Sequence, residues 1–228
     1  MAYTTIDDPS AYFQTVLYTG NDTARAITND GNSDLQPDLV WIKCRSATGN
    51  HGLFDSSRGV NKRLASDENT EELTSQSNLL TAFSSDGFSL GNDSNNYSIN
   101  ENTKTFVAWQ WAANGGTLTT VNSNGATNKV DEHKRQTNAT AGFAIVTYEG
   151  VEDDNGNFPT FDHNLGKAAD FVIVKNRSQA DAWAVLHKTT SAANGLNSLV
   201  LDTTAAVSTS LDPWDGNPGT TNAVYVKG

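Results

Sequence analysis

Apolar residues along this chain come in short alternating bursts that are separated by turn residues. Residues 13–18, 39–44 and 106–111 show the alternation most clearly, and a period of two is typical of β-strands. A long amphipathic helix is absent; residues 66–74 fit either one short helical turn capped by Ser66 or an exposed loop. Asn-Gly and Asp-Gly pairs, which readily take the positive φ angles of tight hairpins, stand at residues 30–31, 86–87, 114–115, 124–125, 155–156, 194–195 and 215–216. We therefore predict an all-β chain.

Two motifs occur twice, in the same order. Residues 13–20 and 143–150 share Phe-x-x-Val-x-Tyr-x-Gly. Residues 37–46 and 169–178 share Asp-x-Val-x-x-Lys-x-Arg-Ser. The separation between the two copies is nearly the same for both motifs, which predicts a tandem duplication of one β-rich module. A duplication favours a building block that multiplies surface over a single catalytic cleft.

We predict two tandem antiparallel β-sandwich modules, jelly-roll-like in topology, each long enough to bury a core. The chain of 228 residues divides into an N-terminal arm (1–12), module 1 (13–112), a Gly/Asn/Thr-rich connector (113–140) with one edge hairpin at 118–121, and module 2 (141–228).

Module 2 ends early. Residues 223–226 correspond to residues 87–90 of module 1, and nothing follows that matches the strand with Trp109 and Trp111. The second sandwich is therefore expected to lack its final strand, and proteins normally cover or pair such an open edge. Either a neighbouring chain supplies that strand, or the sequence is a fragment of a longer protein, which is the interpretation we favour.

Charge and cysteine content narrow the partners. The formal net charge is -11, from 26 acidic and 15 basic residues, and such a surface repels nucleic acid and anionic lipid. Cys44 is the one cysteine and lies in an apolar run, which favours a small buried hydrophobe and excludes an intramolecular disulfide. The sequence has no apolar stretch long enough to span a membrane, and its N-terminus does not resemble a signal peptide.

The sequence lacks the usual signatures of catalysis. Nucleophile elbows, phosphate-binding loops and dinucleotide fingerprints do not occur, and the four histidines are scattered. Asp162 and His163 are the one adjacent acid–imidazole pair, but neighbours on a strand point to opposite faces, so a turn or strand-end pair is favoured. Asp55, Asp86 and Asp202 lie near strand ends without a linking pattern and are interpreted as solvated turn acids rather than glycosidase carboxylates. We predict no catalytic residue and no cofactor.

Two features bear on metal and sugar binding. Residues 153–157 (Asp-Asp-Asn-Gly-Asn) offer oxygens at alternate positions, but the glycine and the closing glutamate of a calcium loop are misplaced, so an ordinary turn is favoured and no metal site is predicted. Aromatic faces can stack on sugars. Trp109 and Trp111 share one strand face and are interpreted as core or inter-sheet packing, so Trp214 and Tyr225 are the candidate ligand-binding residues.

Four ordered stretches carry a family resemblance: residues 36–43, 53–59, 84–91 and 107–111. They resemble a recurrent module of virion structural proteins of tailed marine phages, including cyanophages, often described as tail fibre proteins. The opening residues 1–13 and the second copy are similar as well, so the resemblance covers nearly the whole chain. It implies a lectin-like β-sandwich, related to the SPRY/concanavalin-like group, mounted on a virion, and it carries over no catalytic or ligand residue.

The leading hypothesis is a non-enzymatic bacteriophage virion structural protein: a tail fibre, an appendage or a capsid decoration. It would assemble with other virion proteins as a homo-oligomer, with a trimer favoured, contact host cell-surface glycan, and reside in the virion after synthesis in the host cytoplasm. One alternative is a carbohydrate-binding, lectin-like adhesion module. Another is a component of a polysaccharide depolymerase spike, although the short repeats of a long β-helix are missing.

Overall fold

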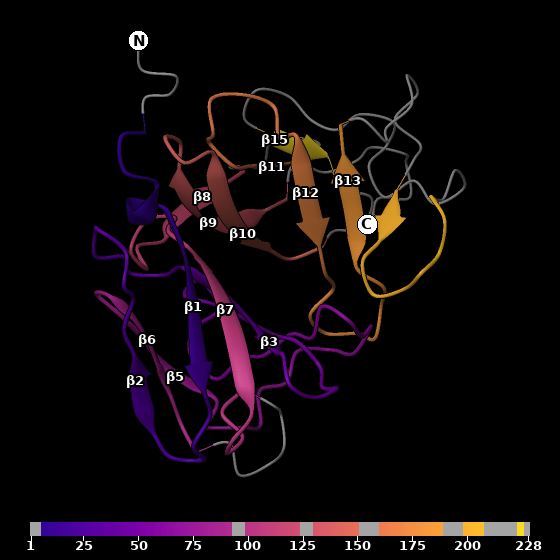
Figure 1. Ribbon diagram of the computed structural model, residues 1–228. Helices are drawn as coiled ribbons and strands as arrows, with labels where there is room; N and C mark the ends of the chain where they lie inside the picture. Colours follow the sequence, from indigo (N-terminus) through magenta and orange to yellow (C-terminus); the bar gives the residue numbers. More distant parts are fainter. Residues whose placement is uncertain are drawn as a thin grey trace. The chain divides into compact units, whose positions relative to one another are not determined.

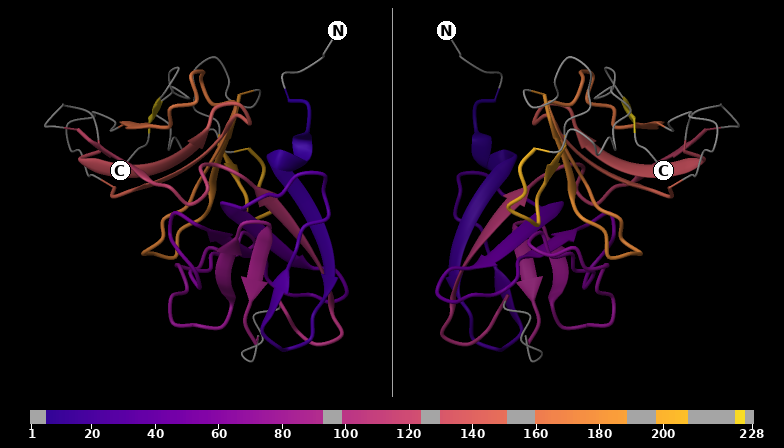
Figure 2. Two further views of the ribbon diagram at one scale, coloured as in Figure 1. Left: turned by 90° about the vertical axis from the view of Figure 1, so that its left-hand side faces the viewer. Right: turned by 90° about the vertical axis from the view of Figure 1, so that its right-hand side faces the viewer.

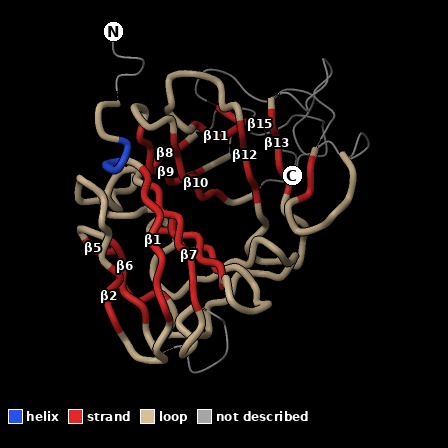
Figure 3. The backbone as a smooth tube through the Cα atoms, viewed as in Figure 1, coloured by secondary structure: helices blue, strands red, loops and turns tan. Residues whose placement is uncertain are grey.

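The computed structural model describes residues 6–92, 99–123, 130–150, 160–188 and 198–207, and the backbone of residues 223–225. The chain divides into two compact units. Unit 1 comprises Met1–Gly116 with Arg177–Ala180, and unit 2 comprises Thr117–Asn176 with Asp181–Gly228. The prediction of an all-β chain is confirmed, because the described elements are antiparallel strands and one short 3-10 turn, η1 (Pro9–Ala11) (Figure 3).

Unit 1 is a two-layer β-sandwich (Figures 1 and 2). Its larger sheet has the order β1-β7-β3-β4, built from β1 (Phe13–Thr19), β7 (Thr105–Trp111), β3 (Leu39–Cys44) and β4 (Gly52–Asp55). Its smaller sheet has the order β2-β6-β5, built from β2 (Arg25–Ile27), β6 (Gly87–Leu90) and β5 (Leu80–Ser84).

The core of unit 1 forms where the apolar faces of these two sheets meet. Ile42 and Phe106 from the larger sheet are 0% exposed, as is Phe88 from the smaller one, and all three belong to one hydrophobic cluster. Cys44 lies in the same cluster and is free and buried, as predicted. Burial alternates along β3, as expected for a sheet that packs on one face.

Turns and loops of unit 1 follow their local chemistry. The β5–β6 turn places Gly87 at φ 101, so the prediction of a turn at Asp86-Gly87 is confirmed. Residues 66–74 form a loop rather than a helical turn, and Leu73 within this loop forms an isolated β-bridge with Arg63. In the N-terminal arm, Asp8 caps η1 by accepting hydrogen bonds from the Ser10 backbone N–H and hydroxyl.

Asp38 closes unit 1. Its side chain is 0% exposed, and Oδ2 accepts from the backbone N–H groups of Ala113 (2.6 Å) and Gly115 (2.9 Å). Oδ1 accepts from the Gly116 N–H (2.7 Å) and the Ser56 hydroxyl (2.6 Å). Four bonds to one carboxylate satisfy its buried charge.

The described residues of unit 2 form three small sheets. Their orders are β10-β9-β8, β12-β13-β14 and β11-β15. Val130, Phe161 and Leu186 form one buried hydrophobic cluster of this unit. The strands are β8 (Thr119–Asn122), β9 (Glu132–Asn138), β10 (Phe143–Tyr148), β11 (Thr160–Asp162), β12 (Phe171–Val174), β13 (Ala184–His187), β14 (Leu199–Val200) and β15 (Ala223–Tyr225).

The connector expected over residues 113–140 contains two strands of unit 2. β8 lies at the edge of its sheet, close to the predicted edge hairpin, but β9 pairs with both β8 and β10. The sequence Glu-His-Lys-Arg-Gln-Thr-Asn of β9 gives no apolar alternation, because its buried positions are His133 and Gln136. A strand whose buried side chains are polar, here one on each face, escapes detection by hydrophobic period.

The duplication is visible in the strand pairing. Leu39 pairs with Asp55 in β3–β4, and Phe171 pairs with His187 in β12–β13. Phe171 and His187 each lie further along the chain than their counterparts, Leu39 and Asp55, by the interval that separates the two copies of the second motif. The remaining pairs of the two hairpins follow in the same register. The duplicated motif at residues 37–46 and 169–178 therefore corresponds to one hairpin built twice.

Candidate functional site

The predicted ligand-binding residues give no site in the described structure. Trp214 and the loop at residues 153–157 lie outside the described residues. Tyr225 lies in β15, where its backbone pairs with Thr160 of β11. Within the described ranges no group of three or more His, Cys, Asp or Glu side chains is placed to hold a metal ion, and no described helix is long and apolar enough to cross a membrane.

Asp162 and His163 lie at the end of β11 and do not bond to each other. The Asp162 carboxylate accepts from Arg135 (2.7 Å) and from the Asn164 N–H (2.8 Å). His163 Nδ1 accepts from the Leu165 N–H (3.2 Å), and burial lowers the pKa of His163, although the charge of Asp162 opposes the shift. The prediction of a strand-end pair is confirmed.

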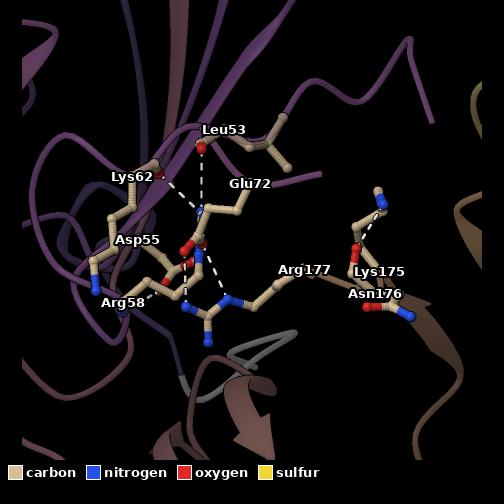
Figure 4. Close-up of polar contacts among 8 residues, drawn as sticks. All are labelled: Leu53, Asp55, Arg58, Lys62, Glu72, Lys175, Asn176 and Arg177. Carbon is tan, nitrogen blue, oxygen red and sulfur yellow. Dashed lines mark hydrogen bonds and ion pairs between the residues drawn. The ribbon is translucent and has the colours of Figure 1, made fainter. Parts of the chain in front are cut away.

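Asp55 is not a solvated turn acid, which corrects the sequence analysis. Its side chain is buried and bonds to Arg58 Nε at 2.5 Å. Arg58 also bonds to Glu72 (2.7 Å) and to the carbonyl oxygens of Leu53 and Lys62 (3.1 Å each) (Figure 4). The guanidinium thus uses its planar fork of donors inside the unit.

Glu72 links this cluster to the segment Arg177–Ala180. Arg177 donates to both Glu72 oxygens, at 3.0 and 2.8 Å (Figure 4). Burial alone would raise the pKa of Glu72, but the hydrogen bonds from Arg177 and Arg58 outweigh it and lower that pKa. Because the charges are matched and their oxygens are occupied, we interpret the cluster as a structural tie between loops.

The outer face of the larger sheet of unit 1 is aromatic. We call the side chains of Phe13, Trp41, Trp109 and Trp111 the aromatic face. Phe13 lies opposite Trp111 in register with ring centroids 5.0 Å apart, and Trp41 lies opposite Trp109 at 6.1 Å in an edge-to-face arrangement. Such cross-strand pairs fix the rings on a rigid surface.

The prediction that Trp109 and Trp111 serve core or inter-sheet packing is wrong for unit 1, because both lie on the face of β7 turned away from its core. Phe106, Ala108 and Gln110 of β7 are the residues turned to the core, each 0% exposed, while both tryptophans lie on the other face and are partly exposed. Alternation in β7 separates the two faces, but both carry apolar side chains, and the buried Gln110 removes the usual contrast.

Polar groups border the aromatic face. Trp41 Nε1 donates to His51 Nδ1 at 2.8 Å, and the His51 backbone N–H donates to Asp67 at 2.8 Å. Burial lowers the pKa of His51, although the Asp67 charge opposes the shift, so the ring is neutral at pH 7. Lys43 donates to the Gly49 carbonyl at 2.7 Å.

The aromatic face can dock an apolar or ring-shaped partner. Phe13 is 40% exposed, and its neighbour Leu17 on the same strand face is 60% exposed. Contiguous exposed apolar side chains with a polar border mark interaction surfaces more often than single exposed residues do. Sequence reasoning singled out Trp109 and Trp111 but assigned them to core or inter-sheet packing.

Comparison with known proteins gives one family. No curated protein and no solved structure matches the chain. A family model described as a domain of unknown function, DUF7483, matches residues 8–228, which is nearly the whole sequence. The chain therefore belongs to the DUF7483 family.

Proposed function

We infer that the chain is a non-enzymatic structural component of a bacteriophage particle, either a tail fibre, an appendage or a capsid decoration. The observation that carries this proposal is the aromatic face, a rigid docking surface on a β-sandwich. The resemblance to virion proteins of tailed marine phages supplies the setting, and the paired β-units suit a module that builds surface.

The aromatic face would bind other virion proteins. Its rings are held by cross-strand contacts, so docking costs little conformational entropy. Aromatic residues dominate the energetic centres of protein interfaces. The net charge of -11 favours partners with neutral or basic surfaces.

The experiment is incorporation of the chain into phage particles. The wild-type chain should be found in purified particles, and the double variant Phe13→Ser, Leu17→Ser should be depleted at least about tenfold, because the docking surface has lost two exposed apolar side chains. Val60→Ser is the matched control, since Val60 is 41% exposed and lies outside the sheet. Absence of the wild-type chain from particles would refute the proposal. Equal incorporation of the wild type, the double variant and Val60→Ser would contradict a role for the aromatic face.

A second candidate, a carbohydrate-binding adhesion module, is favoured by the same rings. Sugar faces stack on tryptophan, and Trp41 with Trp109 offers such rings beside Lys43 and His51. A glycan array should then show binding that Trp109→Ala abolishes and Trp214→Ala leaves intact. The opposite pattern would return the site to Trp214, and no binding by the wild-type chain would exclude this candidate.

A further inference from the structure

Two strands of unit 2, β10 and β12, each have an edge whose counterpart in unit 1 pairs with β7. In unit 1, β7 lies between β1 and β3 and joins them into one sheet. In unit 2 the corresponding strands, β10 and β12, belong to two separate sheets, and in the described residues each is the terminal strand of its sheet. Among the described residues, the difference between the units is therefore a strand in the position of β7.

The bonding pattern identifies which edge of β10 is open. Alternate residues of an antiparallel strand direct their backbone groups to opposite sides. The Ser123 N–H donates to the Asp131 carbonyl (2.8 Å). The backbone groups of odd-numbered residues of β9 therefore point to β8, and those of even-numbered residues point to β10. With the observed register, Phe143, Ile145 and Thr147 bond to β9, and the outward edge is formed by Ala144, Val146 and Tyr148.

That outward edge corresponds to the β7 side of β1. The Gly20 N–H bonds to the Lys104 carbonyl and the Ala112 N–H to the Tyr12 carbonyl, so even-numbered residues of β1 face β7. When the first motif, residues 13–20, is aligned with its second copy, residues 143–150, their counterparts are Ala144, Val146 and Tyr148.

β12 shows the same correspondence. The Lys188 N–H donates to the Asp170 carbonyl (2.9 Å). The backbone groups of even-numbered residues of β12 therefore point to β13, and those of Phe171 and Ile173 point to the open edge. Their counterparts in the first copy of the second motif are Leu39 and Trp41, which lie on the β7 side of β3, as the bond from the Arg45 N–H to the Thr105 carbonyl shows.

Side-chain exposure also differs between β3 and β12. Val40 and Ile42 of β3 are 0% exposed, whereas Val172 and Val174 of β12 are only partly buried. Phe171 is 54% exposed. Val146, Tyr148, Val172 and Val174 nevertheless pack against one cluster, so β10 and β12 share a core, and no described strand lies between them.

We propose that unit 2 binds, between β10 and β12, an extended polypeptide segment that has the pattern of β7 and carries no acidic residue. Its inward positions would be apolar or small, as Phe106 and Ala108 are. β7 holds no charged residue and follows Lys104, so a neutral or basic donor also suits the acidic chain. A second copy is a poor donor of β7, because its Phe106 and Ala108 are 0% exposed in its own core. This inference does not depend on the proposed virion role.

The test is binding of a fluorescent peptide with the sequence of residues 104–112 and added lysines for solubility. We expect saturable binding to the full chain at one site. One peptide is N-methylated at the positions of Phe106, Ala108 and Gln110, which face β1 in unit 1, and a second at those of Val107, Trp109 and Trp111, which face β3. Each should bind at least about tenfold more weakly, because each loses three backbone bonds to one edge.

Three results would overturn the proposal. They are no binding of the unmodified peptide, equally tight binding of a scrambled peptide, and sensitivity to only one of the two methylation sets, which would indicate addition to a single edge. A dimer of the chain that the peptide dissociates would identify β7 of a second copy as the occupant, which contradicts the exclusion of that donor. Phe171→Ser should weaken binding at least about threefold. The same substitution of an exposed phenylalanine on unit 1, Phe13→Ser, should leave binding unchanged.

Discussion

The two copies of one hairpin, β3–β4 and β12–β13, differ in the burial of one of their two strands. In β4 and β13 the matched residues Phe54 and Leu186 are both at most 1% exposed. In β3 and β12 the matched residues Ile42 and Val174 diverge, since the first is fully buried and the second only partly. β3 has two neighbours and β12 has one in the described structure. The comparison shows that burial in a duplicated module depends on its neighbouring strands as much as on its own sequence.

Truncating the matched pair should give the largest contrast. We expect Ile42→Ala to lower the free energy of unfolding of unit 1 by about 2–5 kcal/mol, because it leaves a cavity in a closed core. Val174→Ala should cost unit 2 about 1 kcal/mol, since fewer buried methyl groups are lost. Hydrogen exchange of peptides from β3–β4 and β12–β13 resolves the two units. Equal losses would contradict the comparison.

The buried charge cluster belongs to unit 1 and should make that unit acid-sensitive. Glu72→Gln should cost about 3 kcal/mol, because the Arg58 guanidinium, 3% exposed in its side chain, loses one of its anionic partners. In the wild type the lowered pKa of Glu72 gives stability that is complete above its ordinary value of 4.5 and is lost as pH falls through the folded-state pKa.

Urea unfolding from pH 7 to pH 3 measures both effects. The Gln variant should lose less stability below pH 4.5 than the wild type does. Arg177→Ala, which removes the more exposed partner (41%), is the control and should cost about 1 kcal/mol or less. A Gln variant with the acid dependence of the wild type would contradict the assignment.

Two turn glycines sharpen the comparison further. Gly87 and Gly142 both have positive φ, at 101 and 71. A Cβ on Gly87 would lie 2.0 Å from the Ile27 carbonyl oxygen, whereas none of the described atoms lies within 4 Å of one on Gly142. Gly87→Ala should cost about 2–3 kcal/mol, and Gly142→Ala about 1 kcal/mol from backbone strain alone. Thermal unfolding of both variants checks this, and a smaller loss for Gly87→Ala would be inconsistent with it.

Unit 2 should respond at the opposite end of the pH scale. Burial raises the pKa of Tyr148 to about 12, so the folded state keeps a proton that the unfolded state releases near pH 10. Stability of unit 2 should therefore fall as pH rises from 10 to 12, by about 1 kcal/mol at pH 11. Tyr148→Phe should flatten this dependence in hydrogen exchange of the β9–β10 peptides. Alkaline sensitivity that persists in the Phe variant would assign it to another group.

Much of the fold could be predicted from the sequence, because the duplicated motifs encode strands directly. The hairpins β3–β4 and β12–β13 and the turn before Gly87 follow from apolar alternation and turn chemistry. β9 escapes such prediction because its buried residues, His133 and Gln136, are polar and lie on opposite faces of the strand. The orientation of β7 cannot be read from its sequence, because both of its faces are apolar.

The buried ionic cluster was beyond sequence reasoning for a different reason. Glu72 and Arg177 are 105 residues apart, and nothing local marks them as partners. Asp55 and Arg58 are close in sequence, but their spacing is equally common on solvated turns. Only the three-dimensional arrangement distinguishes a buried acid from an exposed one.

Asp38 has a mechanical consequence. The three N–H groups that it accepts from belong to Ala113, Gly115 and Gly116, which are the last residues of unit 1 before the chain enters unit 2. Tension along the backbone from the C-terminal side would load these bonds before it reached β7. Because bonds to a carboxylate are roughly twice as strong as those to a neutral acceptor, Asp38 would act as an anchor that keeps the first sandwich intact while the remainder of the molecule is pulled.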